Sequence, residues 1–275
     1  MGTLAYAGAT SHVGKIARDP HATPEVSDGL HAAWDTMRDD LYGREVDALI
    51  VVATDHYETF GLHNYPSFCL GVSDSYEAWG EFGNPTGTVA GHAALSEALL
   101  EGLVSRGFDL SRSFDMRLDH SFVVPLTKLL RTPPIPVIPL FVNCNTPPLP
   151  SLSRCFALGG AIADVVERLP GDTRVAVVGT GGISHWVGLP RAGQINEEFD
   201  RRFLELIGAT QLDEVLSWSD EWINEYAGNG ALEIRTWMVA HGAARSAPAT
   251  VLAYAPMHPW HTGIGIVRYE IGVPA

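Results

Sequence analysis

Short apolar runs alternate with amphipathic segments along most of the 275-residue chain. The apolar runs, rich in Val, Ile and Ala, predict buried strands at Leu4–Ala9, Ala48–Ala53, Val137–Val142, Val175–Gly179 and Thr250–Tyr254. Apolar residues at three- and four-residue spacing predict helices at Ser27–Tyr42, Val89–Ser105, Cys155–Arg168, Glu197–Leu206 and Ala231–Ala240. This alternation favours an α/β fold, in which helices flank a central mixed or parallel sheet and an active site lies at the carboxyl ends of the strands.

Nothing in the pattern divides the chain, so a single domain over residues 1–275 is predicted. The proline-rich stretches Thr132–Pro139 and Thr146–Pro150 are expected to be ordered connections, because proline fixes φ and lacks an N–H. The segment Phe60–Gly87 is rich in Gly, Pro and aromatic residues and has little helical period. It is predicted to be a long loop over a cleft.

Charge argues against nucleic acid as a partner. The formal net charge is -14 and no run of Lys or Arg stands out, so a surface that neutralises phosphates is missing. An anionic substrate would need a locally placed Arg or Lys, because the overall charge does not attract it.

The cysteine count bears on location. Cys69, Cys144 and Cys155 form no CxxC pair, and an odd number argues against a secreted disulfide framework. No run of 18 apolar residues and no signal-peptide pattern occurs. The sequence therefore predicts a cytoplasmic protein without a membrane span.

Four histidines stand in polar or glycine-containing segments. His12, His56 and His185 each follow a predicted strand, and His120 precedes an apolar segment. A single histidine usually lies on the surface, or in the core with its hydrogen bonds satisfied. Three strand ends that each present an imidazole are a constellation that suggests a shared site. The glycines at 179–182 lack the GxGxxG spacing and the Walker lysine of nucleotide sites. They are expected to form a tight turn that directs His185 into the cleft.

Histidines at neighbouring strand ends suggest a metal site. Two histidines and one carboxylate with open positions are the ligands of non-haem Fe(II) oxygenases, although zinc accepts the same set. Spacing does not choose between the two metals. It also leaves four candidate carboxylates: Glu214, Glu221, Glu225 and Glu233.

Several motifs together carry a resemblance that runs nearly end to end. They are Ser11-His12, Asp55-His56, Leu118–Leu126, Arg154–Gly159, Gly179–His185, Pro190–Gly193 with Ile195-Asn196, and Gly230–Met238. With these motifs the chain resembles the LigB-like class III extradiol ring-cleavage dioxygenases, of the protocatechuate 4,5-dioxygenase β-subunit type.

This resemblance implies roles for five residues. It implies that His12, His56 and Glu233 bind Fe(II), that His120 is the acid/base group, and that His185 hydrogen-bonds the substrate or its carboxylate. The implied reaction opens the ring of a small aromatic or heteroaromatic substrate with O2. Catechols, aminophenols and hydroxypyridones all present a suitable chelating pair, and the sequence does not choose among them.

Some expectations concern the surroundings of this site. Asp55 and Asp119 adjoin His56 and His120 and are candidates to orient these imidazoles. Some relatives carry an extra domain or a small lid subunit, so we expect a homo-oligomer that closes its own pocket, or a small partner subunit. The two alternatives are a divalent-metal hydrolase and a non-catalytic relative on the same scaffold.

Overall fold

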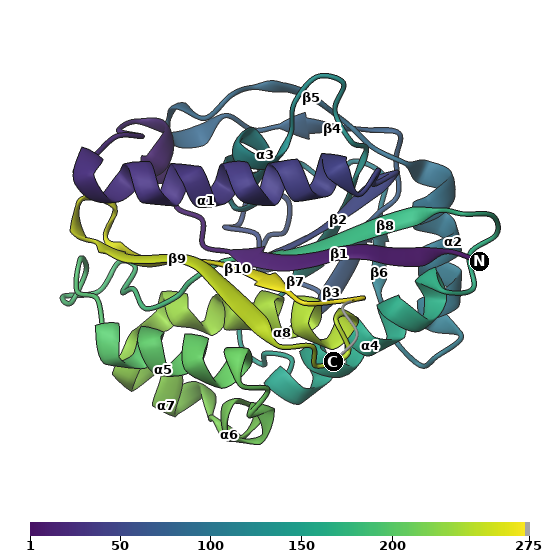
Figure 1. Cartoon of the computed structure of the whole chain (residues 1–275). Helices are drawn as coiled ribbons and strands as arrows, with labels where there is room; N and C mark the ends of the chain where they lie inside the picture. Colours follow the sequence, from purple (N-terminus) through teal and green to yellow (C-terminus); the bar gives the residue numbers. More distant parts are fainter. Residues whose placement is uncertain (273–275) are drawn as a thin grey trace.

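One mixed sheet of eight strands forms the centre of the molecule, in the order β6-β3-β7-β2-β8-β1-β10-β9 (Figure 1). The structure is a computed structural model that describes residues 1–272. The strands of this sheet are β1 (Thr3–Thr10), β2 (Ala48–Ala53), β3 (Phe68–Gly71), β6 (Ser111–Ser113), β7 (Val137–Val142), β8 (Arg174–Thr180), β9 (Ala249–Met257) and β10 (Thr262–Tyr269). A separate antiparallel pair joins β4 (Ser75–Ala78) to β5 (Gly87–Ala90).

The four central strands, β7, β2, β8 and β1, are parallel, so their carboxyl ends share one edge of the sheet. On either side of them, β3 runs antiparallel to β7, and β10 runs antiparallel to β1. The predicted mixed α/β sheet is confirmed, and each predicted strand corresponds to an observed one. The strand β10 was not predicted, because the glycines of Thr262–Tyr269 interrupt the run of β-branched residues.

Helices cover both faces of the sheet (Figure 1). The α-helices are α1 (Pro24–Gly43), α2 (Ala93–Val104), α3 (His120–Leu129), α4 (Leu152–Val166), α5 (Glu197–Gly208), α6 (Leu212–Ser217), α7 (Asp220–Ala227) and α8 (Ile234–Ala243). The 3-10 turns are η1 (Gly14–Ala17), η2 (Glu81–Gly83), η3 (Asn229–Glu233) and η4 (His258–Trp260). Along β2, Leu49 and Val51 pack with α1 and α3, while Ile50 and Val52 pack with α2, α4 and α8. Burial on both faces explains the continuous apolar run of this strand.

Two sequence predictions need correction, and one helix was missed. The helix predicted at Val89–Ser105 begins only at Ala93, because the residues before it pair with β4 and His92 caps the helix. The segment Phe60–Gly87 is not one loop, since it contains β3 and β4. The helix α3 was missed because Pro125 lies in its interior, where proline is usually excluded.

No helix within residues 1–272 is long and apolar enough to cross a membrane. Cys69, Cys144 and Cys155 are all free and buried.

Candidate metal centre

The parallel strands bring three predicted ligands together at one edge of the sheet. His12 lies just after β1, His56 just after β2, and Glu233 at the junction of η3 and α8. Glu233 Oε2 is 3.7 Å from His12 Nε2, and Glu233 Oε1 is 3.5 Å from His56 Nε2. The side chains of His12 and Glu233 are almost completely buried. Two imidazole nitrogens and a carboxylate therefore face one another within the range that a shared cation could bridge.

The other carboxylates that spacing left open lie elsewhere. Glu214 is on α6 and forms an ion pair with Arg202, while Glu221 and Glu225 are exposed on α7. None of the three lines the histidine cavity. Only Glu233 of the four sequence candidates shares the cavity with the histidines.

His120 and His185 line the same cavity, which has a volume of about 500 Å³. The ring of His120 stacks on that of His56 with 4.2 Å between centroids, and it lies 5.5 Å from the ring of His12. The structure thus gathers all five predicted site residues around one hollow.

A chain of hydrogen bonds that begins next to a proline of α3 orients His12. Pro125 has no N–H, so the Ser121 carbonyl one turn earlier in α3 lacks its helical donor. The Thr180 hydroxyl donates to this carbonyl at 2.8 Å. The Thr180 oxygen then accepts from His12 Nδ1 at 3.3 Å, because its own proton is already engaged. The lone pair of His12 is left on Nε2, which faces Glu233.

His56 is oriented by Asp119 and not by its neighbour Asp55. Asp119 Oδ2 accepts from His56 Nδ1 at 2.8 Å and from the His56 backbone N–H at 2.9 Å. Asp55 instead accepts from the backbone N–H groups of Thr59 and Phe60. Asp119 therefore orients an imidazole as expected, although it holds His56 and not its sequence neighbour His120, while the Asp55 carboxylate accepts from backbone N–H groups instead. Adjacency in sequence does not give the partner, because a side chain at a strand end turns away from its neighbour.

Glu81 on η2 orients His120 and was not among the predicted site residues. Its Oε1 lies 2.7 Å from His120 Nδ1 and also accepts from the His120 backbone N–H. Because a carboxylate only accepts, Nδ1 carries the proton and the Nε2 lone pair is free. Glu81 lies 39 residues from His120 in the chain. The only sequence signal was the expectation that its segment lies over a cleft.

His185 is held in the same way by a backbone carbonyl. Its Nδ1 donates to Ile183 O at 3.1 Å, and its ring packs so closely on Gly230 that an added Cβ would lie 2.1 Å from Nε2. All four site imidazoles thus engage an oxygen acceptor through Nδ1. Which nitrogen a histidine presents is set by its other hydrogen bond, so each one presents Nε2 to the cavity.

The glycine-rich turn after β8 makes room for Glu233. A Cβ on Gly181 would lie 2.6 Å from the Glu233 Cβ, and the Gly182 N–H donates to Glu233 Oε2 at 2.6 Å. The φ of Gly181 is 148°, which an L side chain rarely adopts. The expected turn precedes His185, which lines the cavity, and its glycines also allow the Glu233 carboxylate to approach the strand end.

The electrostatics of the cluster suit a bound cation. Burial lowers the pKa of His12 to about 3, so its ring is neutral and its lone pair available. Burial would raise the pKa of Glu233, but the neighbouring histidines hold it well below its ordinary value. Burial would lower the pKa of His56, yet the Asp119 carboxylate raises it well above its ordinary value. The same carboxylate stabilises positive charge on His56 whether a proton or a metal supplies it.

A second donor set competes with this one. His12, His56 and His120 each offer a nitrogen within 4.8 Å of the others. We favour Glu233 over His120 as the third ligand, because a buried carboxylate needs a positive charge beside it and no Lys or Arg contacts this one within residues 1–272. The two histidines and Glu233 therefore fit a divalent metal ion, with His120 beside it.

Comparison with known proteins identifies the family. The family described as the catalytic LigB subunit of aromatic ring-opening dioxygenase matches residues 6–265. The chain belongs to the LigB family. It is 33% identical to a 2,3-dihydroxyphenylpropionate/2,3-dihydroxicinnamic acid 1,2-dioxygenase of Burkholderia vietnamiensis, over 81% of this chain and 84% of that protein. A protein of the same name from a Rhodococcus species is 28% identical over 94% of this chain and 96% of its own length.

Two further likenesses add to this. A gallate dioxygenase of Pseudomonas putida is 36% identical, over 59% of this chain and 49% of that protein. The crystal structure of an uncharacterized protein from Escherichia coli K12 shares the fold, with a TM-score of 0.54 and 15% identity over 97% of this chain and all of the other. The family confirms the prediction of a ring-cleaving dioxygenase.

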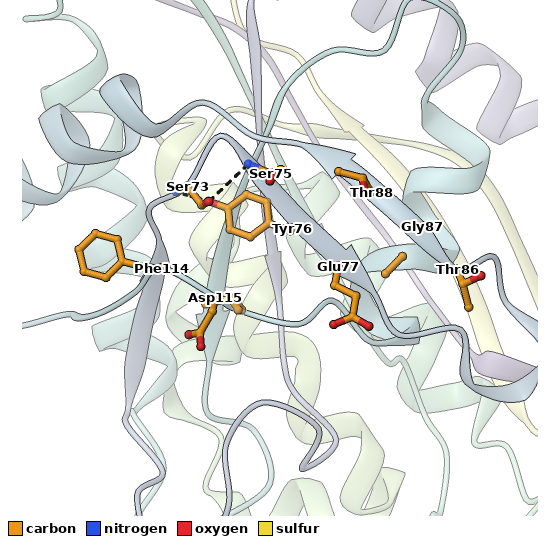
Figure 2. A pocket seen from close by; sticks show the side chains of 11 residues that line it. Ser73, Ser75, Tyr76, Glu77, Thr86, Gly87, Thr88, Phe114 and Asp115 are labelled. Carbon is orange, nitrogen blue, oxygen red and sulfur yellow. Dashed lines mark hydrogen bonds between the residues drawn. The ribbon is translucent and has the colours of Figure 1, made fainter.

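A second hollow of this LigB protein, of about 570 Å³, lies away from the histidines. The β4–β5 pair and the segment after β6 line it, with Tyr76, Glu77 and Asp115 among its side chains (Figure 2). It holds no histidine and no cysteine. Because the donors that a transition metal prefers are missing there, the histidine cavity is the candidate site.

The close approach at Gly181 gives a first prediction. Gly181→Ala should weaken metal binding at least tenfold, because the new Cβ displaces Glu233, and should cost roughly 1–3 kcal/mol of folding stability. Gly171→Ala is the matched control: Gly171 also has a positive φ, of 71°, but no atom lies within 4 Å of an added Cβ. Metal titration and thermal melts of both variants check this. Equal metal affinity in the two would show that the approach at Gly181 does not position Glu233.

Asp200 gives a second prediction, about pH and stability. It is buried on α5, accepts from Ser184 N–H and from the Tyr254 hydroxyl at 2.8 Å, and burial raises its pKa to about 7. A folded-state pKa above the unfolded value means that stability is greatest at low pH and is lost as pH rises through about 7.

The difference in unfolding free energy between Asp200→Asn and the parent protein should therefore shift in favour of the variant by roughly 2 kcal/mol as the pH rises from 5 to 8. Urea denaturation of both proteins at each pH measures the change. Asp213→Asn, at an exposed position of α6, is the control and should leave the pH dependence unaltered. Parallel curves for Asp200→Asn and the parent would contradict the assignment.

Proposed function

We propose that this chain is an Fe(II)-dependent extradiol dioxygenase that inserts both atoms of O2 into a catechol-type or heteroaromatic ring. His12, His56 and Glu233 hold the iron in this proposal. The observation that carries it is the convergence of the Nε2 atoms of two histidines and one buried carboxylate at the carboxyl ends of β1, β2 and β8. Two histidines and a carboxylate leave coordination positions open, which is the arrangement of non-haem Fe(II) oxygenases. Bound Fe(II) would favour the ionised form of a diol and supply the redox capacity that O2 chemistry needs.

His120 would move the proton. Its Nε2 lone pair faces the cavity while Glu81 holds Nδ1–H, so the ring can accept a proton from a substrate hydroxyl and return it later. Imidazole is the side chain best suited to such transfer near neutral pH. His185 would accept a hydrogen bond from the substrate through its own Nε2, since Ile183 O engages Nδ1.

Apolar side chains would hold the ring. Phe82, Trp186 and Trp260 line the cavity together with the histidines. The Phe82 ring meets His120 edge to face, with 5.3 Å between centroids. A flat ring between these walls would be oriented toward the proposed metal and shielded from water.

The named relatives support a catechol-type substrate. The proteins similar to this chain are named for 2,3-dihydroxyphenylpropionate and for gallate. Aminophenols and hydroxypyridones present a comparable pair of ligand atoms. A panel of these compounds, incubated with Fe(II)-loaded protein while oxygen uptake is recorded, identifies the substrate class.

Redox treatment separates this proposal from the hydrolase alternative. Fe(II) must donate electrons, so peroxide should abolish oxygen uptake, and anaerobic Fe(II) with ascorbate should restore it. A hydrolase would act with Zn(II) and without O2. Activity that peroxide does not reduce and that persists without O2 would favour the hydrolase.

We further propose that the chain acts as one catalytic domain in the cytoplasm and forms a homo-oligomer, or binds a small lid subunit. Val187 and Leu189, 52% and 44% exposed, lie in the loop that follows His185 at the cavity. A second chain would cover these apolar side chains. Light scattering on the purified protein measures its mass in solution and tests the homo-oligomer.

A further inference from the structure

A buried carboxylate supports the loop that carries His185 from outside the cavity. Asp200, on α5, is completely buried, and within residues 1–272 it forms no ion pair. Arg201 and Arg202, beside it on the helix, pair with glutamates instead. Asp200 Oδ1 accepts from the Ser184 N–H at 2.8 Å, and Oδ2 accepts from the Tyr254 hydroxyl at 2.8 Å. A buried carboxylate without a cation depends on such donors.

The same carboxylate fills the space beside Gly263, at the start of β10. A Cβ on Gly263 would lie 2.0 Å from Asp200 Oδ2, so a larger residue there would displace the carboxylate. Two backbone hydrogen bonds of 3.1 Å join Gly263 to the loop: its carbonyl accepts from the Ile183 N–H, and its N–H donates to the Ser184 carbonyl. Asp200 therefore lies where the loop after β8 meets β10.

Ser184 is also bound through its side chain. Its hydroxyl accepts at 2.8 Å from the N–H of Asn196, the residue that caps α5. The N–H, the carbonyl and the hydroxyl of Ser184 are thus bound to Asp200, Gly263 and Asn196, respectively. Two of these three contacts come from α5 and its cap, so this helix determines where Ser184 lies.

His185, the next residue, takes its orientation from the loop itself. Its Nδ1 donates to the carbonyl of Ile183, two residues earlier, while its backbone binds Ala227 and Gly230. Because the acceptor of the ring belongs to the same loop, a shift at Ser184 would move the ring and its acceptor together. The position of His185 Nε2 in the cavity therefore depends on how firmly Ser184 is held.

Holding the loop with a carboxylate lowers stability at neutral pH. Burial raises the pKa of Asp200 to about 7, because the charged form loses its hydration in the core. An asparagine would offer the same oxygen to the Ser184 N–H without this cost. Buried ionisable groups that work against stability concentrate where function requires a defined geometry.

We infer that Asp200 is a positioning residue for the histidine cavity: it clamps residues 183–185 to β10 and thereby places His185 Nε2 for its hydrogen bond with the substrate. The inference rests on the proposed function and adds to it a residue that does not line the cavity. The helix α5 lies against β9 and β10, which brings Asp200 to both strands (Figure 1). Tyr254 of β9 fixes the carboxylate, and the carboxylate fixes the loop.

Hydrogen exchange tests the clamp without turnover. In Asp200→Ala the amides of Ser184 and His185 should exchange roughly tenfold faster than in the parent, because the acceptor of the Ser184 N–H is gone. Asp200→Asn keeps an oxygen acceptor and should exchange nearly as slowly as the parent. Leu206→Ala is the matched control, since Leu206 is also buried on α5. It should lose stability through a cavity but leave these two amides protected.

A double-mutant cycle tests whether Asp200 acts through His185. The probe is 3-(2,3-dihydroxyphenyl)propionate, a compound for which similar proteins are named. With Fe(II)-loaded protein of equal iron content, His185→Ala should raise KM roughly tenfold, the scale of one hydrogen bond, and Asp200→Ala roughly fivefold. The double variant should have the KM of His185→Ala alone, because the two residues act as one unit. Anaerobic calorimetry repeats the cycle as dissociation constants.

The outcomes separate this inference from the proposed function. Unchanged exchange in Asp200→Ala, or a rise in KM that persists in full when His185 is already Ala, overturns the positioning role and leaves the dioxygenase intact. Faster exchange, together with a rise in KM that is absent in the His185→Ala background, supports it. If no catechol, aminophenol or hydroxypyridone gives oxygen uptake, the proposed reaction is overturned, and exchange with the calorimetric cycle decides the clamp. Absence of binding as well overturns both.

Discussion

Glu233→Gln should leave a folded protein that binds Fe(II) at least 10²-fold more weakly than the parent and consumes no oxygen with any catechol. The substitution keeps an oxygen that can accept from the Gly182 N–H, so the turn after β8 is retained. What it removes is the negative charge between His12 and His56. Loss of one ligand of a three-ligand site removes both affinity and the electronic environment of the metal. Iron content after anaerobic loading, measured on the preparation used for oxygen uptake, checks the result.

Glu225→Gln is the matched control, since Glu225 is an exposed glutamate of α7 that spacing alone could not distinguish from Glu233. It should bind iron and consume oxygen as the parent does. His12→Ala and His56→Ala should behave like Glu233→Gln. Full iron occupancy and normal turnover in Glu233→Gln would leave the three histidines, His12, His56 and His120, as the binding set.

The central sheet could be predicted because its strands are continuous apolar runs. A strand buried on both faces, such as Ala48–Ala53, has no polar position to interrupt the pattern. The strands that were missed are short or glycine-containing, as in Phe68–Gly71 and Thr262–Tyr269. Their pairing depends on neighbours distant in sequence, so local pattern does not reveal it.

The helix α3 shows a different limit. Pro125 made a helix over His120–Leu129 unlikely by local rules, yet the carbonyl that it leaves free is used by Thr180. A tertiary contact thus compensates for the lost helical hydrogen bond. The local exception lies at the functional site, where it orients His12.

The site residues could be proposed from strand ends and from resemblance, but their supporting groups could not. Asp119 supports His56 across 63 residues, and Glu81 supports His120 across 39. Neither partner is adjacent in sequence to the imidazole it holds. The parallel sheet determines which loops meet, and spacing along the chain carries no information about that meeting.

The Glu81–His120 pair leads to the last prediction. His120→Phe should retain near-normal iron and still bind substrate, while kcat falls roughly 10²-fold or more, the usual scale of general acid–base catalysis. Phenylalanine can preserve the stacking on His56 and the contact with Phe82, so the cavity keeps its shape. What the substitution removes is the Nε2 lone pair that would accept the proton.

Glu81→Gln provides the graded comparison. Its amide oxygen can still accept from His120 Nδ1, but it no longer stabilises positive charge on the ring, so kcat should fall less than in His120→Phe while iron is retained. Single-turnover oxygen uptake with a parallel iron assay measures both quantities on each preparation. If His120→Phe loses its iron while Glu233→Gln keeps it, His120 is the third ligand. If His120→Phe turns over within a few-fold of the parent with its iron intact, the proton moves through another group. Loss of turnover with the iron intact, deeper in His120→Phe than in Glu81→Gln, assigns the proton transfer to His120 and its orientation to Glu81.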